Sequence, residues 1–87
     1  MRVYFSEKAL QEYIKLTKTN KKIAERIALL IEEIEQNPTS GRGKPEMLKH
    51  ELSGFWSRRI RGKLRLIYRI VDDESVEISS CCGYHIK

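Results

Sequence analysis

The spacing of apolar residues changes along the chain, and this change restricts the fold more than any other feature of the sequence. Between residues 9 and 34, apolar side chains recur every three or four positions, the spacing of helices with one apolar face. From residue 55 onward they alternate with polar side chains, as in strands that are buried on one face. A short alternating segment, residues 2–5, precedes the helical part. The sequence therefore predicts the element order β-α-α-β-β-β.

Capping residues divide the helical part into two helices. Ser6 before Glu7 is typical of a helix N-cap, Asn20 can cap a second helix, and Asn37 with Pro38 ends it. Two amphipathic helices in succession form a hairpin. We expect the two apolar stripes to lie in the core: Ala9, Leu10, Tyr13, Ile14 and Leu16 in the first helix, and Ile23, Ile27, Leu30, Ile31 and Ile34 in the second.

Three strands are predicted after residue 54, at residues 55–60, 63–70 and 76–82, with a tight turn at Arg61–Gly62. In the middle strand Leu64, Leu66, Tyr68 and Ile70 fall on the face toward the helices, whereas Lys63, Arg65, Ile67 and Arg69 form a basic face toward solvent.

The faces of the two flanking strands follow from the same alternation. Phe55, Ser57 and Arg59 share one face, which assigns Trp56 to the core. In the last strand Glu77, Ser79 and Cys81 share one face, which Gly83 and His85 continue if the strand persists.

Chain length and composition limit the class of protein. With 87 residues we expect a single domain, 1–87, of the α+β class, with the helix hairpin on one face of a twisted, mainly antiparallel sheet. Hydrophobic residues make up 40% and charged residues 33%, and the polar N-terminal segment resembles neither a signal peptide nor a membrane span, so we expect a cytoplasmic protein. Adjacent Cys81 and Cys82 are expected to be reduced, and no spacing predicts a metal site or another cofactor.

The net charge of +5 is concentrated in one part of the sequence. Residues 7–36 contain six basic and six acidic residues, whereas residues 42–69 contain nine basic and two acidic residues, a balance of +7. Such a field attracts phosphate backbones, although a merely basic, solvated surface explains the charge equally well.

The segment from residue 37 to residue 54 is rich in glycine and proline and longer than most connections, which favours a functional role. It contains Glu46, isolated among cations, and Lys49. With Arg59, Arg65 and His85, these residue types suit RNA cleavage, in which a base deprotonates the 2′-hydroxyl, a cation stabilises the phosphoryl oxygens and an acid protonates the leaving 5′-oxygen. From spacing alone an alternative stays open for each of the three. Glu46 can be a loop carboxylate paired with a lysine, Arg65 an exposed strand cation, and His85 a histidine near a frayed end.

Three blocks resemble the YoeB family of RelE-like toxins: Gly43-Lys-Pro-Glu-Met-Leu-Lys-His50, Leu52-Ser-Gly-Phe-Trp-Ser-Arg-Arg-Ile60 and Leu64-Arg-Leu-Ile-Tyr68. The resemblance runs from the first strand to Cys82-Gly-Tyr-His85. It implies the RelE-like microbial ribonuclease fold and a ribosome-dependent mRNA interferase, which cuts the message in the A site without a metal ion and leaves a 2′,3′-cyclic phosphate and a 5′-hydroxyl.

By the same resemblance, Glu46 matches the general base, Arg65 the phosphate-stabilising arginine and His85 the general acid. Lys49 and Arg59 match RNA-contacting cations, and Tyr84 is a further candidate for RNA contact. The family usually ends in Tyr-His-Tyr, but this chain has Ile86 after His85. Loss of that final ring predicts slower cleavage or a different codon preference.

The resemblance also implies a YefM-like antitoxin whose acidic tail covers the site, with the ribosome and mRNA as further partners. Toxins of this branch often form homodimers, and the toxin–antitoxin complex contacts operator DNA mainly through the antitoxin. Two other functions suit the same fold: a ParE-like toxin without catalysis, and an RNA-binding module that uses the basic sheet.

Overall fold

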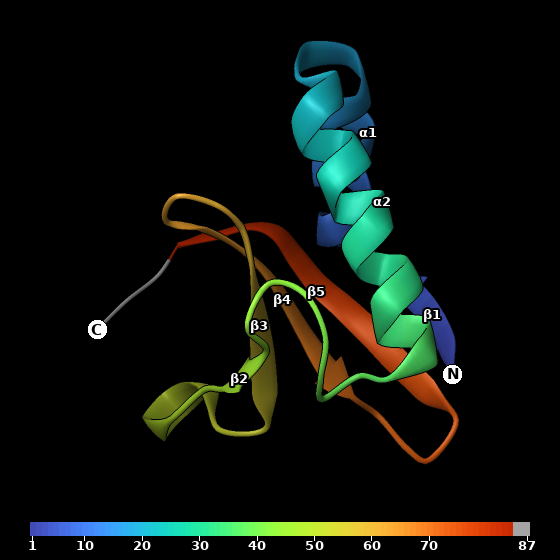
Figure 1. The fold of residues 1–87 in the computed structure, drawn as a ribbon, viewed down its shortest axis with the longest axis vertical. Coiled ribbons are helices and arrows are strands. Elements are labelled where there is room, and N and C mark those ends of the chain that lie inside the picture. Colours follow the sequence, from blue (N-terminus) through green and yellow to red (C-terminus); the bar gives the residue numbers. More distant parts are fainter. Residues whose placement is uncertain (85–87) are drawn as a thin grey trace.

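The computed structural model, which describes residues 1–84, contains the predicted elements in the predicted order (Figure 1). They are β1 (Arg2–Phe5), α1 (Glu7–Thr19), α2 (Lys21–Gln36), β3 (Phe55–Arg61), β4 (Leu64–Ile70) and β5 (Ser75–Tyr84). Two short elements that the sequence did not predict lie in the connection after α2, namely β2 (Glu46–Met47) and the 3-10 helix η1 (His50–Leu52).

Both predicted helix caps are confirmed. The Ser6 hydroxyl accepts a hydrogen bond from the Ala9 amide at 3.1 Å, and the Asn20 side chain accepts one from the Ile23 amide at 3.2 Å. Each satisfies an amide at a helix start that has no partner within the helix. Asn20 also ends α1, so one residue separates the two helices and makes the hairpin tight. Among the described residues, no helix is long and apolar enough to cross a membrane.

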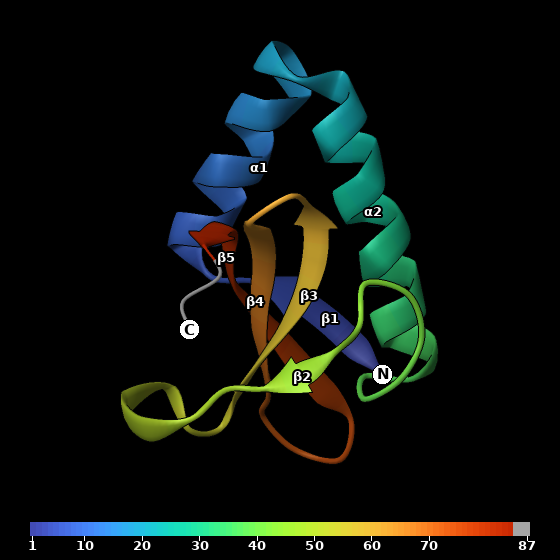
Figure 2. The same ribbon diagram turned by 60° about the vertical axis from the view of Figure 1, so that its left-hand side comes forward.

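The five strands form one mixed sheet in the order β1-β5-β4-β3-β2. Within residues 1–84 the β1–β5 pair alone is parallel, so the predicted mainly antiparallel sheet is confirmed. Figure 2 shows the two helices together on one side of the sheet. The core between them consists of Ala9, Ile23, Ile27, Leu30, Ile34, Ile60, Leu66, Tyr68, Val76, Ile78 and Cys81, with Trp56 packed against its edge as predicted.

Three residues assigned to the core are exposed. Leu10 and Ile14 are 41% and 39% exposed, because α1 packs through Ala9, Tyr13 and Leu16, and these two lie beside that stripe. Ile70, the last residue of β4, is 36% exposed, unlike the buried Leu66 and Tyr68 on the same strand face.

The face predicted for Cys81 is wrong. The pairing of β5 with β4 shifts register twice, between Gly83 and Ser80 and again between Ser80 and Ile78. Each shift inserts a residue and breaks the simple alternation of faces. Cys81 therefore points into the core with Ile78, and its thiol donates to the Ala9 carbonyl at 3.5 Å.

The expectation of an open basic sheet face is also wrong in part. Arg65 is only 8% exposed. Arg65 lines the floor of a groove between the sheet and the segment that contains β2 and η1. Because that segment folds over the strands, the sheet face forms the bottom of a groove.

Candidate active site

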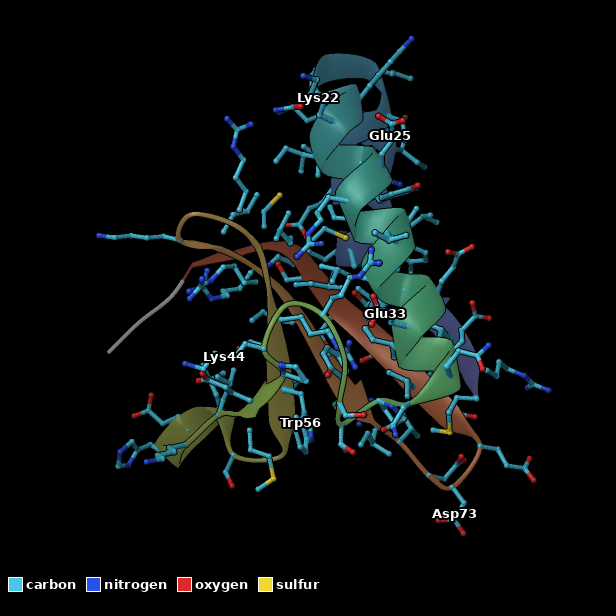
Figure 3. All side chains as sticks on the ribbon, in the orientation of Figure 1. Lys22, Glu25, Glu33, Lys44, Trp56 and Asp73 are labelled. Atoms are coloured by element: carbon cyan, nitrogen blue, oxygen red, sulfur yellow. The ribbon has the colours of Figure 1, made fainter. Side chains whose placement is uncertain are left out.

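The segment that carries Glu46 is fixed to β3 by backbone pairing. Glu46 lies opposite Ser57 in the β2–β3 register, and the Leu48 amide donates to the Phe55 carbonyl at 2.9 Å. The Glu46 carboxylate is about half exposed, with Lys44 Nζ 3.6 Å from Oε1. Figure 3 shows Lys44 near the β2–β3 edge of the sheet, well away from Lys22 and Glu25 on α2.

The two arginines of the prediction come from neighbouring strands. Arg59 and Arg65 are direct partners in the β3–β4 register, so their side chains leave the same face of the sheet. Arg59 is exposed, whereas Arg65 is buried and donates through Nη1 to the carbonyls of Gly62 at 2.7 Å and Leu64 at 3.2 Å. These bonds hold the Arg65 guanidinium at the turn between the two strands.

The carboxylate and the arginines meet at one small hollow. Its volume is about 190 Å³, and it is lined by Gly43, Lys44, Glu46, Ser57, Arg59 and Arg65. One carboxylate and three cationic side chains thus surround a space that is open to solvent. A phosphodiester there would find cations for its oxygens and a carboxylate that can accept a proton.

The other candidate residues lie around this hollow or outside the described chain. Lys49 lines a wider groove that shares Glu46 and Arg65 with the hollow. Tyr84 is the last residue of β5 and pairs with Leu64. His85 lies outside the described residues, so its role as general acid stays a prediction.

Sequence reasoning missed Arg58, which is fully buried. Its Nε donates to the Tyr68 hydroxyl at 3.1 Å, its Nη1 to the Arg42 carbonyl at 3.1 Å and its Nη2 to the carbonyls of Asn37 and Ser40, both at 2.8 Å. The Tyr68 hydroxyl in turn donates to the Pro38 carbonyl at 2.6 Å. A signal was available, because the alternation that turns Trp56 and Ile60 inward also turns Arg58 inward.

Arg58 holds the start of the loop that delivers Glu46. The four carbonyls that Arg58 and Tyr68 engage belong to residues 37–42, directly before the hollow. At the next residue the Gly43 carbonyl accepts the Arg59 amide at 2.6 Å, and a Cβ on Gly43 would lie 3.0 Å from the Arg59 carbonyl oxygen. Gly43, with a φ of 83°, therefore permits a close backbone approach that a larger residue would obstruct.

The two thiols do not add a nucleophile to the site. Burial, with the Glu12 carboxylate nearby, raises the pKa of the Cys81 thiol to about 12. The same two causes raise the pKa of Cys82, which lines the wider groove. Both residues are free cysteines and remain protonated near neutral pH, where only the thiolate is strongly nucleophilic.

Comparisons with known proteins identify relatives along nearly the whole chain. The model of a family described as the YoeB-like toxin of bacterial type II toxin–antitoxin systems matches residues 5–86. Toxin YoeB of Escherichia coli K12 is 42% identical over 85 residues, which cover 98% of this chain and 99% of the relative. The YoeB dimer of Staphylococcus aureus superposes with a TM-score of 0.87 at 36% identity over 98% of each chain. The heterotetrameric YoeB–YefM complex from S. aureus gives 0.86 at 36% identity and the same coverage of both chains.

Proposed function

This chain belongs to the YoeB-like toxins of bacterial type II toxin–antitoxin systems, and we propose that it is an endoribonuclease that cuts mRNA in the ribosomal A site. The observation that carries the proposal is the hollow in which Glu46 lies with Arg59 and Arg65. A non-catalytic binder has no need of a carboxylate among cations, because the carboxylate repels the phosphate.

In the proposed mechanism, the Glu46 carboxylate accepts the proton of the ribose 2′-hydroxyl. The 2′-oxygen attacks the adjacent phosphorus, and the bond from phosphorus to the 5′-oxygen breaks. Arg65 stabilises the charge on the phosphoryl oxygens, and Arg59 and Lys49 bind flanking phosphates. His85 is the predicted donor of a proton to the leaving oxygen. The products are a 2′,3′-cyclic phosphate and a 5′-hydroxyl, and no step requires a metal ion.

The geometry of Arg65 supports its proposed role. Its guanidinium is held at Nη1 by two backbone carbonyls, so little side-chain entropy is lost when a phosphate binds. Preorganised cations of this kind stabilise developing charge better than mobile surface lysines.

We further propose a YefM-like antitoxin as partner, in line with the S. aureus YoeB–YefM complex. An acidic, disordered tail would find a complementary surface around the +7 segment 42–69. A homodimer is proposed from the S. aureus YoeB dimer, and contact with operator DNA only through the antitoxin complex. The proposed location is the cytoplasm, where the ribosomes and mRNA are.

Primer extension on an mRNA in a translating extract tests the proposal. Wild-type protein should produce cuts that require ribosomes and disappear when it is premixed with antitoxin. Glu46→Gln and His85→Ala should each lower the cleavage rate about 10²–10⁴-fold, the usual contribution of a proton-transfer partner. Glu25→Gln, an exposed carboxylate on α2, is the matched control and should cleave like wild type. An intact message with wild-type protein, or full cleavage by Glu46→Gln, would contradict the mechanism.

A further inference from the structure

A wider groove of about 940 Å³ opens beside the small hollow and shares Glu46, Ser57 and Arg65 with it. Its floor is the face of the sheet, where Phe55 of β3 and Ile67 of β4 lie among the lining residues. Its wall is the segment that contains β2 and η1. A groove of this size is within the range of about 300–1,000 Å³ typical of small-ligand sites.

The wall of the groove has a defined conformation. Backbone hydrogen bonds close η1: the Leu52 amide donates to the Lys49 carbonyl at 3.2 Å, and the Ser53 amide donates to the His50 carbonyl at 3.0 Å. His50 has a φ of 59°, a left-handed conformation that residues with a Cβ rarely adopt. Backbone strain of this kind persists where the surrounding structure holds it, most often at ligand sites.

The lining combines exposed apolar side chains with cations. Met47 and Leu52 on the wall are 63% and 45% exposed, and Lys49 lies between them in the sequence. On the floor, Gly83 lies against Ile67, because a Cβ on Gly83 would be only 2.6 Å from Ile67 Cγ1. The missing side chain lets Ile67 lie close over β5 at Gly83, and the small side chains of Ser79, Ser80 and Cys82 complete this side of the groove.

We propose that this groove seats the base of the nucleotide next to the scissile phosphate and so sets the sequence preference of cleavage. The inference rests on the proposed ribonuclease function, since Glu46 and Arg65 would hold the phosphate where the hollow and the groove meet. Bases are planar rings that bind apolar and aromatic surfaces through their faces, and the adjoining backbone phosphates bind cations. Phe55 supplies the aromatic surface, Ile67 and Leu52 the apolar contacts, and Lys49 the neighbouring charge.

Ribosomes programmed with mRNAs that differ only in one base flanking the cut provide the test. For each protein variant, the measured quantity is the ratio of cleavage rates between the best and the worst base at each flanking position. This ratio cancels any change in the amount of folded protein or in the overall rate. Phe55→Leu removes the ring and keeps apolar bulk, and Leu52→Ala shortens a wall residue that is 45% exposed and lies outside the buried core. Leu10→Ala is the matched control, because Leu10 is similarly exposed on α1.

At one flanking position we expect both groove variants to reduce the ratio about fivefold or more, the lower range for loss of a base-stacking contact. Leu10→Ala should keep the wild-type ratio. Cleavage by wild type with unchanged ratios in both groove variants would overturn this inference and leave the proposed function standing. Unchanged ratios with weaker inhibition by antitoxin would overturn it in favour of an antitoxin-binding groove. No cleavage by wild type would overturn the proposed function, and this inference with it.

Discussion

Replacing Arg58 by methionine should lower the free energy of unfolding by about 3 kcal/mol, because a single buried side chain anchors the loop before the site. Methionine fills similar space without donors. The carbonyls of Asn37, Ser40 and Arg42 then lose the partners that the guanidinium provides, and so does the Tyr68 hydroxyl.

The magnitude follows from two opposing effects. Hydrogen bonds from a charged donor contribute about 1.5–3 kcal/mol each, so the four bonds give at least about 6 kcal/mol. Removing a buried cation also removes the penalty for taking it out of water, which is several kcal/mol. The loop carbonyls lie near the surface and recover water in part, so a net loss of about 3 kcal/mol is the expected outcome.

Urea unfolding followed by Trp56 fluorescence and by circular dichroism measures the loss. Arg59→Met is the matched control, since Arg59 follows directly in β3 but is exposed, and should change stability by less than about 0.5 kcal/mol. Tyr68→Phe removes one acceptor of Arg58 and the donor to Pro38, which should reduce stability by about 2 kcal/mol. A loss below about 1 kcal/mol in Arg58→Met would refute the anchoring role.

Three further predictions concern other parts of the fold. The Glu12 carboxylate accepts the Cys81 amide at 2.8 Å and the Ser80 hydroxyl at 3.2 Å, so Glu12→Ala should lower stability by about 1–3 kcal/mol in urea unfolding. Burial raises the pKa of Cys81 from 9.0 to about 12. The buried, protonated thiol therefore makes its full contribution to the free energy of unfolding below pH 9, and that contribution is lost as the pH rises toward 12. Between pH 8 and pH 10, wild type should therefore lose about 1 kcal/mol more stability than Cys81→Ala. Gly43 and Gly54 both have positive φ, but only at Gly43 would a Cβ meet other atoms, so Gly43→Ala should reduce RNA cleavage far more than Gly54→Ala. Equal cleavage by these two variants would show that the approach of Gly43 to β3 does not position Glu46.

The sequence predicted the elements that depend on local patterns. Caps at Ser6 and Asn20 and the alternation in β3 and β4 are short-range signals, and the structure confirms them. The same alternation placed Arg59 and Arg65 on the faces of their strands that point away from the core, and the β3–β4 register puts the two residues opposite each other. Such features need only the helical or strand period, which the sequence displays directly.

Features that depend on contacts between distant segments were not predictable. The bulges in β5 arise where Glu12 of α1 binds the backbone at Cys81, a contact across 69 positions of the sequence. Strand β2 exists only because Glu46 and Met47 reach β3, and two residues carry no alternation pattern of their own. The low exposure of Arg65 was not predictable either, because alternation alone assigns this side chain to solvent, whereas its guanidinium donates to the carbonyls of Gly62 and Leu64 at the turn.

The fold holds the two central groups of the site with unequal strength. Arg65 lies on β4, which pairs on both sides and packs against the core through Leu66. Glu46 lies on a two-residue edge strand that pairs only with β3. Segments with few buried contacts open locally at lower free energy than the whole domain unfolds. Opening of the β2 segment would remove the carboxylate and leave the arginines in place. Under the proposed mechanism, the site would then keep its phosphate-binding cations and lose its general base. The Arg58 anchor and the Gly43 contact oppose this opening from the side of the segment that precedes Glu46.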